Sequence, residues 1–196
     1  MKHLLPKIAT AALLVTGTLA LSHCAHDPVT NFNAASVNPR KLAADSRTAL
    51  KQLYANNPAA KKLGSRAKGI LVFPNITKGG LMVGGMAGNG ALIRNDGSIR
   101  DFYQTAGASY GLQAGIQQYG YALFLMDNSA FTNINRSSGW EVGSSPSLVI
   151  VDEGMAASIS TTTLNKSTYA FFFNQRGLMG GLGLQGSKIT RIDPPR

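Results

Sequence analysis

The chain has 196 residues, of which 44% are hydrophobic and 14% are charged, with 22 glycines and a formal net charge of +10. This composition excludes an intrinsically disordered chain, and the roughly 170 residues that would follow a targeting segment are the size of one domain. The three histidines and the single cysteine all lie in the first 26 residues. The remainder therefore lacks the side chains for Ser-His-Asp or Cys-His catalysis and for the usual zinc sites, and we predict no enzyme activity, metal site or cofactor.

The first residues are typical of an export signal. Lys2 and Lys7 precede an apolar or small run over residues 8–21, which is too short to span a bilayer. The sequence Leu21-Ser22-His23-Cys24 then resembles a bacterial lipobox, although His23 replaces the small residue that normally precedes the cysteine. We expect residues 1–23 to be a lipoprotein signal peptide and Cys24 to carry the acyl (palmitate) anchor.

An ordinary secretory signal is the alternative. It would be cut after Ala20 and would leave Cys24 free. By resemblance to lipoprotein sorting, Ala25 favours the outer membrane, so we expect a lipid-anchored protein of the cell envelope, at the periplasmic face of the outer membrane or at the cell surface. Residues 24–37 are poor in periodic apolar residues and read as a tether, so the domain is expected over residues 38–196.

Two helices are expected after the tether. Asn38-Pro39 is a start signal, and apolar residues recur at helical spacing over residues 39–55. Asn57-Pro58 repeats the signal for a short helix that ends near Gly64, with Lys61 and Lys62 in its last turn, where cations suit the helix dipole. The two helices should form a hairpin with a basic exposed side.

The excess positive charge is confined to one segment. Residues 40–78 hold nine basic residues and one acid, Asp45, which gives this segment a charge of +8. After removal of Lys2 and Lys7, the other charges of the mature chain cancel. Such a patch attracts lipid headgroups or nucleic acid, and the export signal argues against nucleic acid. A solvated helix face that keeps the protein soluble is the alternative.

From residue 69 onward the pattern is that of β-structure. Runs of β-forming residues alternate with Gly, Asn, Asp and Ser, and Asn95-Asp96-Gly97 is a tight hairpin signal. A short helix is expected over residues 128–134. The sequence predicts an α+β fold, in which two helices precede an antiparallel, glycine-rich β-barrel or sandwich. Eleven short strands are expected, over residues 69–73, 81–87, 90–94, 98–105, 108–116, 121–126, 148–151, 157–163, 169–173, 178–184 and 188–192.

Glycines mark two further features. In residues 107–117, glycines and small polar residues alternate with apolar residues, which favours close approach of another backbone on the bare face. The sequence Gly80-Leu81-Met82 is echoed by Gly177-Leu178-Met179, and two such strands could pack as neighbours. The acidic pair Asp152-Glu153 follows a predicted strand and is interpreted as a solvated turn; an enzyme that uses carboxylates is the least favoured alternative.

Several motifs together resemble the SYLF domain, a lipid-binding family. They are Ala67-Lys68-Gly69-Ile70-Leu71-Val72-Phe73-Pro74, Lys78-Gly79-Gly80, Gly84-Gly85, Gly88-Asn89-Gly90, Gly111-Leu112-Gln113-Ala114-Gly115 and Arg176-Gly177-Leu178-Met179-Gly180-Gly181 with Gly186. The resemblance runs from about residue 40 to residue 192. It implies binding of anionic phospholipids or phosphoinositides and no catalytic activity. Residues 169–175 depart from the Tyr-, Ser- and Arg-rich stretch of eukaryotic members, which weakens transfer of their headgroup preference.

The leading hypothesis is therefore a membrane-anchored lipoprotein that binds anionic lipids through its basic helical region. The candidate headgroup-binding residues are Lys51, Lys61, Lys62, Arg66, Lys68, Lys78 and Arg176. The alternative is a structural or adaptor lipoprotein of the envelope that binds a protein partner or peptidoglycan. Some eukaryotic SYLF proteins bind actin, a role that an exported protein could have only where it meets host cells.

Overall fold

The computed structural model describes residues 36–135, 140–142, 148–151 and 166–195. In these ranges, three helices are present, α2 (Pro39–Asn56), α3 (Pro58–Gly64) and α4 (Asn128–Ile134). The strands are β1 (Gly69–Arg94), β2 (Ile99–Leu125), β3 (Trp140–Val142), β4 (Leu148–Val151) and β5 (Thr168–Ile192). The signal peptide, Cys24, most of the tether, the strand expected over 157–163 and the pair Asp152-Glu153 lie outside the described residues.

The helices begin where the sequence predicts, because an asparagine caps each of the first two. The Asn38 side chain accepts a 3.0 Å hydrogen bond from the backbone N–H of Lys41, and the Asn57 side chain accepts one of 2.9 Å from Ala60. A proline follows each cap, at a position where the missing N–H costs no hydrogen bond. None of the helices in the described ranges is long and apolar enough to cross a membrane.

The strands form one sheet in the order β1-β2-β5-β3, with β4 beside β5. The pairs along this path are antiparallel, whereas β4 runs parallel to β5. The tight hairpin at Asn95-Asp96-Gly97 is confirmed, since the N–H of Gly97 donates to the Arg94 carbonyl at 2.9 Å. The α+β class with two leading helices is confirmed.

The long strands correct the expectation of many short ones. Strands β1, β2 and β5 have 26, 27 and 25 residues. Each joins at least two of the expected short strands, because glycines that look like turn residues in the sequence are paired within the sheet, as Gly80 is with Gly115. The two echoed glycine motifs are not direct neighbours, since β2 lies between β1 and β5.

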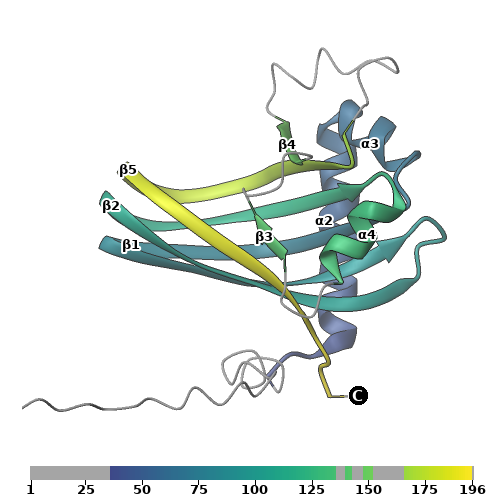
Figure 1. Ribbon diagram of the computed structural model, residues 1–196, viewed down its shortest axis with the longest axis horizontal. Coiled ribbons are helices and arrows are strands. Elements are labelled where there is room, and N and C mark those ends of the chain that lie inside the picture. The colour runs from purple at the N-terminus through teal and green to yellow at the C-terminus, as the bar shows by residue number, and fades with distance from the viewer. Residues whose placement is uncertain (1–35, 136–139, 143–147, 152–165, 196) are drawn as a thin grey trace, which may run out of the picture.

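The sheet folds over itself. Figure 1 shows that the three long strands bend back at the end where they are labelled, so that each contributes to two layers. The halves of β1 meet closely, because a Cβ added to Gly90 would lie 2.6 Å from the Val72 carbonyl oxygen. The expected barrel or sandwich therefore takes the form of one open, folded sheet.

The two larger hydrophobic clusters of the described residues stabilise this arrangement. The first contains buried side chains from both halves of the long strands, including Leu71, Leu92, Tyr103, Leu123 and Ile189, with α4 packed against it. The second lies between the helices and the sheet, and its buried members are Ala49, Leu50, Leu53, Ala60, Leu63, Ala67, Ile70, Val72, Ile93, Ala122, Phe124, Tyr169 and Phe171. Helices α2 and α3 are thus fixed to one outer face of the sheet.

Candidate functional site

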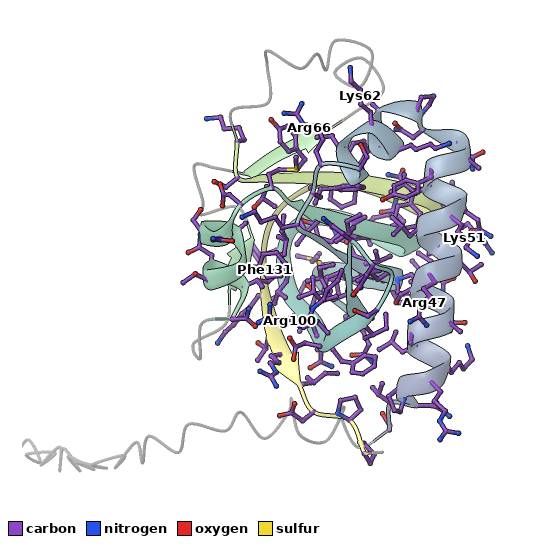
Figure 2. All side chains as sticks on the ribbon, turned by 90° about the vertical axis from the view of Figure 1, so that its right-hand side faces the viewer. Arg47, Lys51, Lys62, Arg66, Arg100 and Phe131 are labelled. Atoms are coloured by element: carbon purple, nitrogen blue, oxygen red, sulfur yellow. The ribbon has the colours of Figure 1, made fainter. Side chains whose placement is uncertain are left out.

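The basic residues predicted on the helices gather at the end of the molecule where the long strands begin and end. Lys51 on α2, Lys61 and Lys62 in the last turn of α3, and Arg66 directly after α3 are all exposed. Figure 2 views this end and shows Lys51 beside Arg47 on α2, with Lys62 and Arg66 above them. The residues Lys51, Lys61, Lys62, Arg66 and Lys68, together with Arg94 and Arg100 described below, are called the cationic end.

Lys68 lies between α3 and β1 and lines a pocket. Its Nζ donates a 2.9 Å hydrogen bond to Oδ1 of Asn128, the first residue of α4. The pocket has a volume of about 580 Å³ and lies between the start of β1, the β1–β2 hairpin and α4. Its lining consists of Lys68, Arg94, Asn95, Asp96, Arg100, Asn128, Phe131 and Thr132.

The pocket carries a positive charge. Lys68, Arg94 and Arg100 line it, against the single carboxylate of Asp96. Hydrogen bonding with Ser98 lowers the pKa of the Asp96 carboxyl, which therefore stays ionised and hydrogen-bonded within its own turn. Three cations and one anion give the pocket lining a net positive charge, which suits a phosphate or carboxylate group of a ligand.

Arg100 is oriented by two neighbours. Its guanidinium carbon lies 5.4 Å from the centre of the Phe131 ring, and its Nε lies 3.2 Å from Oδ2 of Asp101. Figure 2 shows Arg100 and Phe131 side by side, away from the helical lysines. An arginine held over an aromatic ring keeps further N–H groups for a ligand oxygen, and arginine binds phosphate in this way.

Arg94 and Arg100 were not among the residues predicted from the sequence. They belong to the β region whose charges cancel, so the net charge of that region conceals them. They do flank the predicted hairpin turn Asn95-Asp96-Gly97, and two arginines on either side of a tight turn must lie close together. This signal could have identified them.

Lys78 and Arg176 lie elsewhere. Lys78 on β1 is opposite Gln117, and Arg176 on β5 is opposite Gln118, so the two cations flank β2 close to the bend of the long strands. Arg176 is two residues beyond Asn174, whose side-chain amide donates to Oε1 of Gln52 on α2 at 3.1 Å. The structure thus places these two predicted residues beyond the cationic end, toward the bend.

No cluster of His, Cys, Asp and Glu suited to a metal ion occurs within the ranges that the structure describes. Hydrogen bonds lower the pKa of two carboxyls, that of Asp96 through Ser98 in its own turn and that of Asp127 through Ser129, Ser167 and the backbone N–H of Ala130. Neither has the raised pKa of a general acid.

The described geometry defines an α+β domain with a folded antiparallel sheet and a cationic end. Residues 106–193 match the family model described as "Ysc84: Las17-binding protein actin regulator". Over residues 106–193 this match confirms the resemblance to the SYLF family that the sequence motifs indicate. Domains of this family are associated with lipid binding and are generally non-catalytic. No match to a curated protein was found.

The matched segment covers most of β2 and extends through α4 to the end of β5. It includes Asn128 and Phe131 of the pocket and Arg176 near the bend. Helices α2 and α3 precede it, so the predicted lysines of these helices lie outside the part of the chain that matches the family.

Proposed function

We propose that this chain is a membrane-anchored lipoprotein whose domain binds anionic lipid headgroups through the cationic end. The observation that carries the proposal is the convergence of Lys68, Arg94 and Arg100 on one pocket, at the same end of the molecule as the exposed lysines of α3. Anionic phospholipids or phosphoinositides are the proposed ligands. A phosphorylated headgroup supplies the negative charge and the acceptor oxygens that this set of donors requires.

Electrostatics gives the cationic end enough affinity without a deep cavity. A basic residue close to an anionic membrane contributes on the order of 1 kcal/mol, and these contributions fall off within a Debye length. Seven basic side chains form the cationic end. Their combined attraction is large enough to hold the domain at a membrane of sufficient negative charge.

The anchor would place the domain at the same membrane. We propose that acyl chains on Cys24 hold the protein in the cell envelope, at the periplasmic face of the outer membrane or at the cell surface. The tether over residues 24–37 reaches at most about 50 Å when fully extended. One lipid anchor and one basic surface together give the two signals that stable attachment requires.

Sedimentation with vesicles tests this proposal. The full chain with Cys24→Ser, which cannot be acylated, is mixed with vesicles of phosphatidylcholine alone or of phosphatidylcholine with phosphatidylglycerol, over a range of salt concentrations. The double variant Lys61→Glu with Lys62→Glu should bind the anionic vesicles at least about thirtyfold more weakly. The matched control is Arg40→Glu with Lys188→Glu, which changes the net charge equally at exposed positions away from the cationic end.

Two results would contradict the proposal. Equal losses in the two double variants would mean that net charge alone matters, as in a solvated surface. Binding that ignores both salt and anionic lipid would favour the adaptor alternative, in which the domain binds a protein partner or peptidoglycan.

A further inference from the structure

The bend of the long strands exposes large apolar side chains. Leu178 is 88% exposed and Leu81 is 75% exposed, and Tyr110 and Ile116 are each about two-thirds exposed, at 68% and 67%. Met82 and Val83 are exposed beside them. These six residues, Leu81, Met82, Val83, Tyr110, Ile116 and Leu178, are called the apolar tip.

The pairing of the strands joins these side chains into one surface. Ile116 on β2 lies directly opposite Leu178 on β5, and Val83 on β1 lies directly opposite Tyr110 on β2. Side chains of directly opposite residues are on the same face of a sheet and lie about 5 Å apart at Cβ. All three long strands thus contribute to a contiguous apolar surface, which on a water-soluble protein marks an interaction site.

The side chains of the apolar tip cannot be buried in the core. The core between the two layers ends at Ile76, Met86 and Tyr119, which are buried just behind the tip. At the bend itself β1 turns back on itself tightly, because a Cβ added to Gly80 would lie 2.6 Å from the Val83 carbonyl oxygen. The apolar side chains are therefore directed into solvent by the fold.

The charges around the tip suit an anionic membrane. Lys78 precedes Leu81 by three residues on β1, and Arg176 precedes Leu178 by two residues on β5. A cation therefore lies close to the apolar tip on each of these two strands. The sequence has no acid over residues 70–94, 102–126 or 154–192. Lysine and arginine near an apolar surface extend along it and keep their charges in the headgroup region.

We propose that the apolar tip inserts into the interfacial region of a lipid bilayer while Lys78 and Arg176 contact its anionic headgroups. The inference rests on the proposed function only in that both name a membrane as the partner. The contacting surface is a different one, because the apolar tip and the cationic end lie at opposite ends of the long strands (Figure 1). A second copy of the chain is a poorer occupant. Two tips facing each other would bring together the cations of both copies with no acid between them.

A fluorophore at the tip tests insertion. In the full chain with Cys24→Ser, a single cysteine at Leu178→Cys carries the environment-sensitive dye NBD, and a control protein carries it at the exposed Ser65→Cys beside α3. With vesicles of phosphatidylcholine and phosphatidylglycerol, the tip dye should shift its emission to the blue. Lipids with a doxyl quencher on the acyl chain should quench the tip dye and leave the Ser65 dye unquenched.

Changes in the tip should weaken membrane binding. Replacing both Leu81→Ser and Leu178→Ser should lower the vesicle partition coefficient roughly tenfold, since two large apolar side chains no longer enter the membrane. The unfolding temperature should stay unchanged, because both side chains are exposed in the free protein.

The outcomes separate the two proposals. If the protein sediments with vesicles and the tip dye is neither shifted nor quenched, tip insertion is wrong and the cationic end remains the contact. If the tip dye is quenched in the Lys61→Glu, Lys62→Glu variant as strongly as in the parent, the tip inserts without help from the cationic end. A blue shift that grows with protein concentration without vesicles would identify a second copy as the occupant and overturn the proposal.

Discussion

The guanidinium carbon of Arg100 lies 5.4 Å from the centre of the Phe131 ring, and this contact joins the start of β2 to α4 across the cationic pocket. The two residues are far apart in the sequence, so the contact exists only in the folded chain. It gives the pocket an arginine whose direction is fixed before a ligand arrives.

Separating Arg100 from the ring should weaken binding of anionic lipid. In Phe131→Leu the side chain stays apolar and the ring is lost, so the guanidinium loses an attraction of about 0.5–1 kcal/mol at an exposed site. Vesicle affinity should fall about two- to fivefold. Arg100→Lys should give a similar loss, since an ammonium group lacks the planar guanidinium that stacks on a ring.

The double variant provides the control for this prediction. If Arg100 and Phe131 act as one unit, Phe131→Leu with Arg100→Lys should bind about as well as either single variant. Losses that simply add would show that the two side chains contribute independently and that the stacking has no role in binding.

The close contact between the halves of β1 predicts a large difference between two glycines. A Cβ at Gly90 would lie 2.6 Å from the Val72 carbonyl oxygen and 2.7 Å from the Phe73 ring, whereas one at Gly85 would find only the Gly107 carbonyl, at 3.7 Å. Gly90→Ala should lower the free energy of unfolding by about 1–3 kcal/mol, because a packed backbone must shift. Gly85→Ala should change it by less than about 0.5 kcal/mol. Urea denaturation measures both, and equal effects would contradict the folded sheet.

The helices could be predicted from sequence because their signals are local. Asn38 and Asn57 cap helices within three residues of themselves, and Asp127 does the same for α4. The expected ranges agree with α2 to one residue and with α4 at both ends. Short-range hydrogen bonds of this kind depend little on the rest of the fold.

The strands and the site depend on distant partners and were predicted less well. Gly80 looks like a turn residue in the sequence, yet it continues β1 because Gly115 lies opposite it. Lys68 and Arg100 share a pocket only because the β1–β2 hairpin returns to α4. Tyr110 and Ile116 belong to the alternating apolar residues of 107–117, a pattern typical of a buried strand face. Both side chains are nevertheless exposed, because the sheet bends at these residues. Pattern alone does not reveal such a bend.

Acid should destabilise the protein through Asp127. Hydrogen bonds from the Ser129 hydroxyl, from Ser167 and from the backbone N–H of Ala130 lower the pKa of this carboxyl to about 2. Since the pKa in the folded state is below the usual value near 4, the stabilisation is present above pH 4 and is lost as the pH falls toward 2. The group is exposed to solvent, so we expect a loss of less than about 1 kcal/mol.

The variant Asp127→Asn isolates this effect. Asparagine caps helices about as well as aspartate and does not titrate, so the capping bond to Ala130 can be retained. The urea midpoint of the parent should fall more than that of Asp127→Asn between pH 5 and pH 2. Parallel changes in the two proteins would mean that other carboxylates cause the acid sensitivity.

Removal of the cap between the two helices should affect both stability and binding. Asn57 ends α2, where its N–H donates to the Leu53 carbonyl at 2.8 Å, and it begins α3, where its side chain accepts from Ala60 at 2.9 Å. Asn57→Ala should cost about 1 kcal/mol of unfolding free energy, and Asn57→Ser should restore most of it. Because α3 holds Lys61 and Lys62 in place, Asn57→Ala should also weaken binding to anionic vesicles at salt concentrations where the protein remains folded. A variant that loses stability but binds as the parent does would mean that the orientation of α3 does not matter to the cationic end.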